Sequence, residues 1–231
     1  MYKLFSIIIL IIFSSIKVYA TETKGIITTI KPINALVSAV VGNTGKTISI
    51  IPADISPHEF KLKPSDAKIL QDGNIIFYVS NHLESSITKV FENLPKNIKI
   101  INLIEETEIE HLAIRDNEAW ERHDHHGEEE HDDHEKDAKK HDDHDDHEKE
   151  DDVHIWLSPD NAIKIVKKVN KELNLFFPEN AKIYNENSTK MINKISILKS
   201  ELKKELSTIK DKPYIVFHDA YQYFEKDFGL N

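Results

Sequence analysis

Residues 74–80 read NIIFYVS, a run that is apolar almost throughout. A strand buried on both faces has this composition, because helices cover both sides of a parallel sheet. Three further runs rich in β-branched residues predict strands at 26–30, 47–51 and 98–103. Stretches with helical spacing fall between these runs, at 33–41, 65–70 and 84–93. Strands that alternate with helices over this length predict an α/β fold with a parallel sheet.

The C-terminal half has stronger helix signals. Ser158-Pro159-Asp160 combines an N-cap serine with proline at the first helical position, and predicts a helix to about Phe176. No Gly or Pro occurs from about 180 to 209, where apolar residues recur at three- and four-residue steps. This pattern predicts one helix of roughly 45 Å, with a coiled-coil segment as the alternative. A strand at 213–217 and a helix at 220–228 are expected after it.

Composition restricts the class of protein. A chain of 231 residues can form one large domain or two small ones. Its formal net charge of −10 argues against a nucleic-acid partner, which would require a basic surface. The absence of cysteine excludes disulfides, a thiolate metal site and a lipid-modified cysteine.

The N-terminus predicts a secretory signal over residues 1–20. Lys3 and Lys17 flank an apolar run of thirteen residues, which is followed by Val18-Tyr19-Ala20, a site of the small-x-small type. The apolar run is shorter than a bilayer span requires. A retained membrane anchor is the alternative. We expect export without a lipid anchor, and therefore a soluble protein of a bacterial periplasm.

Residues 121–154 read ERHDHHGEEEHDDHEKDAKKHDDHDDHEKEDDVH and hold nine of the thirteen histidines. Dense charge without apolar residues predicts a disordered segment, for which we expect the limits 105–152. Imidazoles beside carboxylates favour weak contact with zinc or similar divalent ions, whereas a plain acidic spacer is the alternative. The expected auxiliary ligands are His123, His125, His126, His131, His134, His141, His144 and His147.

Three other histidines occur in ordered contexts. His58 lies in the loop after the second predicted strand, His154 lies just before a helix N-cap, and His218 lies at the end of a predicted strand. Ligands of open α/β sheets bind outside the carboxyl ends of strands. If the three imidazoles converge there, they would form an open zinc site with a fourth position for water or a carboxylate.

The segments SPHEFKLKPSDAKIL (56–70), HIWLSPDNA (154–162) and VFHDAYQYFEKDFGL (216–230) closely resemble the periplasmic solute-binding proteins of bacterial zinc ABC transporters. These proteins belong to a wider cluster that includes metal-binding lipoproteins and adhesins. The resemblance covers roughly residues 24–231, including the acidic insertion. It implies two parallel-sheet α/β lobes joined by one long helix, with Zn²⁺ held between the lobes by three histidines. By motif match, these ligands are His58, His154 and His218.

The resemblance also implies a domain organisation. The N-terminal lobe spans 21–177, the connecting helix spans 178–210, and 211–231 begin a second lobe that we expect to be incomplete in a C-terminally truncated chain. Manganese-binding relatives carry Glu at the position of His218, so His218 favours zinc over manganese. Some zinc relatives have Glu before the first ligand, whereas this chain has Pro57.

The function implied is high-affinity capture of zinc in the periplasm by a monomer, and its delivery to an inner-membrane ABC permease. A zinc-dependent hydrolase is an alternative, because an open three-histidine site also suits hydrolysis. No general base is evident beside the histidines, so we expect no enzyme. A periplasmic metal buffer that acts through the tract alone is another alternative. His82, His111 and Glu84 match no motif, and exposed loop positions are the default for the two histidines.

Overall fold

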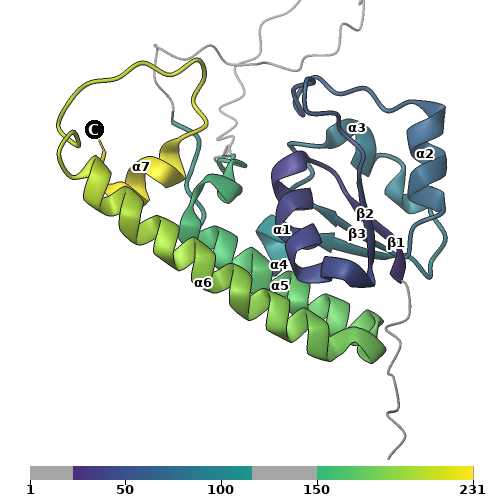
Figure 1. The fold of residues 1–231 in the computed structure, drawn as a ribbon. Coiled ribbons are helices and arrows are strands. Elements are labelled where there is room, and N and C mark those ends of the chain that lie inside the picture. Colours follow the sequence, from purple (N-terminus) through teal and green to yellow (C-terminus); the bar gives the residue numbers. More distant parts are fainter. Residues whose placement is uncertain (1–22, 116–149, 231) are drawn as a thin grey trace, which may run out of the picture.

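A four-stranded parallel sheet forms the centre of the N-terminal part of the chain (Figure 1). The computed structural model describes residues 23–115 and 150–230. The strands lie in the order β2-β1-β3-β4, and their bounds are Thr23–Thr28 (β1), Gly45–Ser49 (β2), Ile75–Tyr78 (β3) and Lys99–Asn102 (β4). All four residues of β3 are buried, and Ile76 pairs with Ile27 on one side and with Ile100 on the other. The predicted parallel α/β sheet is confirmed, with strand limits shifted by one to three residues.

Short helices follow the strands. They are α1 (Lys31–Val41), α2 (Pro64–Gln71), α3 (Ser85–Thr88) and α4 (Leu103–Glu106). The helix predicted over 84–93 is wrong in extent, because α3 has only four residues and a separate 3-10 turn, Phe91–Asn93, precedes Pro95. Helix α1 ends at Gly42, whose φ of 60° favours glycine, and it packs against β1 and β2 as well as against α5 and α6.

Two long helices run beside the sheet layer. Helix α5 (Pro159–Phe176) begins as predicted, with the Ser158 hydroxyl accepting a hydrogen bond from the backbone N–H of Asn161 at 3.1 Å. Helix α6 (Ala181–Leu206) packs along α5 and α1 and reaches α7 (Gln222–Phe228), as Figure 1 shows. None of the helices in the described residues is long and apolar enough to cross a membrane.

The apolar stripe of α6 is buried only as far as Ile195. Tyr184 and Ile195 are buried, whereas Leu198 is half exposed. The helix packs on α1 and α5, and this packing gives it its place on the α/β layer.

Two further predictions are wrong, one about a strand before α7 and one about the limits of the insertion. Residues 213–217, all within the described part of the chain, form no strand, and Ile215 is 99% exposed. A strand requires a paired neighbour, and no described strand lies beside this segment. The predicted insertion limits of 105–152 are too wide, because Glu105 and Glu106 belong to α4, Ile109 and Asp152 are buried, and Ala113 bridges to Asp151 in an antiparallel pair.

Candidate metal site

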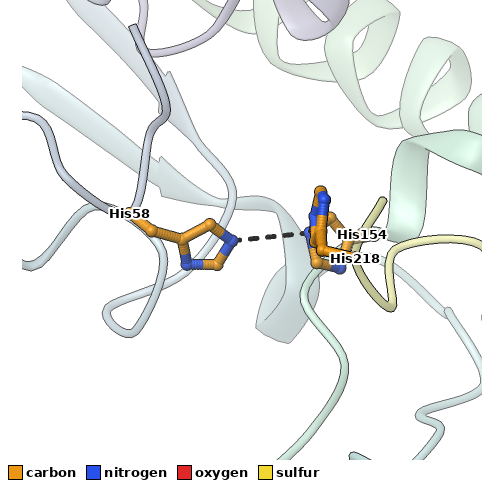
Figure 2. Close-up of side chains that lie close together, drawn as sticks. All are labelled: His58, His154 and His218. Carbon is orange, nitrogen blue, oxygen red and sulfur yellow. Dashed lines mark hydrogen bonds between the residues drawn. The ribbon is translucent and has the colours of Figure 1, made fainter. Parts of the chain in front are cut away.

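The imidazoles of His58, His154 and His218 meet at one point (Figure 2). The Nε2 atom of His154 lies 3.5 Å from Nε2 of His58 and 3.4 Å from Nε2 of His218. One ligand atom from each residue lies within 4.8 Å of the other two. In the described part of the chain, these three residues are the one group of His, Asp or Glu whose ligand atoms converge in this way.

The two short nitrogen–nitrogen distances fit zinc. Zinc binds imidazole nitrogen at about 2.0–2.1 Å in a tetrahedral arrangement, so two such ligands lie about 3.3 Å apart. The measured separations of 3.5 and 3.4 Å are close to this edge length. Two edges of a zinc tetrahedron thus already have nearly the required length, the third pair of ligand atoms lies within 4.8 Å, and three histidines leave a fourth position open.

The three ligands come from different parts of the fold. His58 lies in the loop that follows β2 at the carboxyl edge of the sheet, as predicted. The loop is anchored by buried Phe60, whose carbonyl accepts a hydrogen bond from the Ser86 hydroxyl at 2.7 Å. His154 is mostly buried, precedes the 3-10 turn Ile155–Leu157, and lies against the Trp156 ring at a centroid distance of 5.4 Å.

His218 lies in irregular backbone between α6 and α7, not at the end of a strand as predicted. Its ring centroid is 5.3 Å from that of His154 and 6.4 Å from that of His58. The side chain is exposed, like that of His58, whereas His154 is the buried member of the group. The group thus has one buried central histidine and two histidines carried by exposed segments.

Asp152 orients the central ligand. Its Oδ1 accepts hydrogen bonds from the backbone N–H of His154 at 2.9 Å and from ring Nδ1 at 2.7 Å. The second bond places the proton on Nδ1, so the lone pair of Nε2 points to the other histidines. A carboxylate in this position also makes the imidazole a stronger ligand. The predicted disordered insertion, 105–152, includes Asp152 and therefore misses this role; the position of Asp152 two residues before His154 is the signal in the sequence that could have indicated it.

Asp152 is itself held by the segment before the insertion. Its backbone N–H donates to the carbonyl of Leu112 at 2.7 Å, and its carbonyl accepts from the Tyr223 hydroxyl at 3.0 Å. The same hydroxyl accepts from the backbone N–H of Leu112 at 3.2 Å. Burial is the main cause that raises the pKa of Tyr223 to about 12, so this hydroxyl remains a donor over the whole physiological range.

Glu84 is a buried carboxylate at the same edge of the sheet, but it is not part of the histidine group. Its Oε1 accepts from the Thr29 hydroxyl at 2.5 Å and from the Val79 N–H at 3.0 Å, and its Oε2 accepts from the Ser80 N–H at 2.9 Å. Burial raises the pKa of Glu84 to about 7, and the three hydrogen bonds oppose this rise. Glu84 therefore ties together the segments that follow β1 and β3.

Of the remaining histidines, the structure describes His82 and His111. His82 is exposed, as expected, and its Nδ1 lies 3.7 Å from Glu150. His111 is also exposed and lies in a loop, as expected, but it has partners: its Nδ1 lies 2.6 Å from Asp151 Oδ2, and its Nε2 lies 3.2 Å from the Ile104 carbonyl. The eight predicted auxiliary histidines of the tract and the predicted signal at 1–20 lie outside the described residues.

Comparison with known proteins gives consistent matches. The family model for the periplasmic zinc-uptake complex component A, ZnuA, matches residues 26–231. The chain is 36% identical over 222 residues to the high-affinity zinc uptake system protein ZnuA of Brucella abortus (strain 2308), covering 91% of this chain and 66% of that protein. It is 31% identical over 206 residues to the protein of the same name from Haemophilus ducreyi, covering 89% of this chain and 64% of that one.

A solved structure has the same fold. The crystal structure of Zn(II)-bound AdcA from Streptococcus pneumoniae aligns with a TM-score of 0.67 at 25% sequence identity. The alignment covers 89% of this chain and 38% of the streptococcal chain. This chain thus spans slightly less than two thirds of the two curated relatives, and a smaller share of the streptococcal protein.

Proposed function

From the premise that this chain belongs to the family of periplasmic zinc-uptake component A, we propose that it captures Zn²⁺ in the periplasm and delivers it to an inner-membrane ABC permease. One observation carries the proposal: the Nε2 atoms of His58 and His218 lie 3.5 and 3.4 Å from that of His154. This spacing is close to the edge of a zinc tetrahedron. The two curated relatives are named as proteins of high-affinity zinc uptake systems, which supports the same cargo.

The donor set favours zinc over manganese. Imidazole nitrogen suits Zn²⁺, whereas Mn²⁺ prefers carboxylate, carbonyl and water oxygen. All three converging groups are imidazoles, and the carboxylate of Asp152 acts on His154 through its Nδ1. We expect water or a carboxylate at the fourth position.

Release of the ion follows from the unequal burial of the ligands. His154 is fixed by Asp152 and the core, whereas His58 and His218 are exposed on segments that approach it from different elements. Movement of either exposed segment removes one nitrogen and leaves a weaker two-histidine site. Contact with a permease could supply this movement. Helix α6 is proposed to be the connector between the N-terminal lobe and the segment that carries His218.

The proposal also covers the parts outside the described residues. Residues 1–20 would direct export and be removed, and the histidines of the tract would gather ions at low affinity. The protein would act as a monomer.

Uptake of radioactive zinc tests the proposed function. The chain is expressed in bacteria that contain the cognate permease but lack any other zinc-binding component. The intact protein is expected to restore uptake at submicromolar zinc, and the His154→Ala variant is expected not to. Equal uptake with both proteins would contradict the proposal. Immunoblotting of the periplasmic fraction verifies that both are exported in equal amounts.

A further inference from the structure

Arg115 makes contacts with two acidic residues on the segment that carries His218. Its Nε donates to Asp219 Oδ2 at 2.9 Å, and its Nη2 donates to Asp219 Oδ1. Its Nη1 donates to Glu225 Oε2 at 2.7 Å, and the Tyr214 hydroxyl donates to the other oxygen of Glu225 at 2.6 Å. The side chains of Asp219 and Glu225 are each 16% exposed, so these pairs are partly shielded from water.

Asp219 directly follows His218, and the backbone around it has little support of its own. Residues 212–221, all within the described part of the chain, form neither a helix nor a strand. Ile215 and Phe217 are fully exposed, Val216 between them is half-buried, and Ala220 is the one buried residue of this segment. The two-point contact with Arg115 therefore fixes the backbone next to the ligand, where no sheet ladder does so.

Two further contacts of α7 begin farther along the chain from His218. The Gln222 amide donates to the Ala113 carbonyl at 3.1 Å, and Lys226 pairs with Glu110 at 2.6 Å. These contacts attach α7 to the same segment, residues 110–115, from which Arg115 extends. They hold the helix, whereas the contact of Arg115 with Asp219 holds the residue adjacent to the ligand.

We propose that Arg115 is a positioning residue for zinc, which holds the Nε2 of His218 beside that of His154 through its two-point contact with Asp219. The inference rests on the proposed function, because it assigns a role at the same three-histidine site. Guanidinium is suited to the task, since its planar fork matches both oxygens of a carboxylate. Lysine keeps the charge but offers a single point of contact, so it cannot define the orientation of Asp219.

The test uses competition between the protein and a chromophoric zinc chelator. Arg115→Lys and Arg115→Ala are each made in the full chain and again in a His218→Ala background. Loss of a group that orients a ligand typically weakens metal binding about 10- to 100-fold. We expect a loss of at least about tenfold for both variants in the His218 chain, and less than about twofold in the His218→Ala chain.

Two controls separate positioning from folding. Lys226→Ala breaks the exposed pair of α7 with Glu110 and is expected to leave zinc affinity unchanged. Thermal unfolding without zinc is measured for every variant. Cobalt provides a spectroscopic readout, because the visible absorption of tetrahedral Co²⁺ should fall when His218 leaves the ion, as in Arg115→Lys. If Arg115→Ala does not fold, Arg115→Lys alone decides the result.

The outcomes are distinct. Wild-type affinity in both Arg115 variants, or an equal loss with and without His218, would overturn the positioning role. If His154→Ala also keeps wild-type affinity, the three-histidine site and the proposed function fail together. If His154→Ala abolishes tight binding while Arg115→Lys retains it, the proposed function stands and the inference about Arg115 alone is wrong.

Discussion

Asp152 holds His154 at two points with one oxygen atom: Oδ1 accepts from the backbone N–H at 2.9 Å and from ring Nδ1 at 2.7 Å. The ring can therefore neither turn nor move its proton to Nε2 without breaking this contact. The proposed central ligand thus already has the tautomer that metal binding at Nε2 requires.

Asp152→Asn is expected to weaken zinc binding by about 10- to 100-fold, because the amide lacks the charge that strengthens the imidazole as a ligand. Chelator competition measures the change. Asp151→Asn is a matched control, since that neighbouring carboxylate pairs with His111 and not with a proposed ligand. An equal loss in the two variants would show that the effect comes from the folding of the segment.

Ser86→Ala is expected to weaken zinc binding by a smaller factor. The lost hydrogen bond joins α3 to the Phe60 carbonyl, two residues from His58, and one such bond contributes about 1 kcal/mol. A full loss of that energy from binding would lower the affinity for zinc about fivefold, so we expect a decrease of about twofold to fivefold. Thr88→Ala, which removes an exposed hydroxyl from the same helix, serves as the control and should bind zinc like the wild type.

Glu84 makes the stability of the zinc-free protein depend on pH. Its pKa of about 7 in the folded state lies above the ordinary value of 4.5, so between these values the folded chain binds a proton that the unfolded chain does not. Lowering the pH from 7 to 4.5 therefore raises the free energy of unfolding, by roughly 3 kcal/mol at most. The contribution is lost again as the pH rises through 7.

Denaturant titrations at pH 5 and pH 8 measure this effect. The side chain of Glu84→Gln cannot titrate. The free energy of unfolding of the wild type, relative to that of the variant, should therefore be larger at pH 5 than at pH 8. A difference that is the same at both pH values would mean that Glu84 does not carry the proton.

Removal of residues 119–147 tests whether tight zinc binding by the three histidines is independent of weak zinc binding by the acidic tract. This deletion keeps Arg115 and Asp152, and the bridge between Ala113 and Asp151 leaves the two flanks close enough for a short loop. Calorimetric titration should then retain one tight event and lose the weak ones. Disappearance of the tight event would assign it to the tract and support a metal buffer instead.

The central features of the fold could be predicted from local sequence. The continuous apolar run at 75–78 specifies a buried strand, and Ser158-Pro159 specifies the start of α5. These signals work because strand burial and helix capping depend on residues that are close in the chain. The error at 213–217 has the same origin: its β-branched and aromatic residues favour a strand, but the segment pairs with no strand among residues 23–115 and 150–230.

The supporting residues of the site could not be found in this way. Arg115 contacts Asp219 across 104 positions, and Leu112 contacts Tyr223 across 111. Charge density around the acidic tract predicts disorder, yet Glu150 and Asp151 pair with residues on its other flank. Such contacts depend on the tertiary fold, which composition does not reveal. The three histidines were predicted from their motifs, and the structure brings them together; their role as ligands stays a prediction.

Diffraction from crystals loaded with one equivalent of zinc, recorded on both sides of the zinc absorption edge, tests the central claim most directly. We predict a single strong anomalous peak about 2.0–2.1 Å from the Nε2 atoms of His58, His154 and His218. A peak that lies away from these three nitrogens, or that contacts only one of them, would contradict the account.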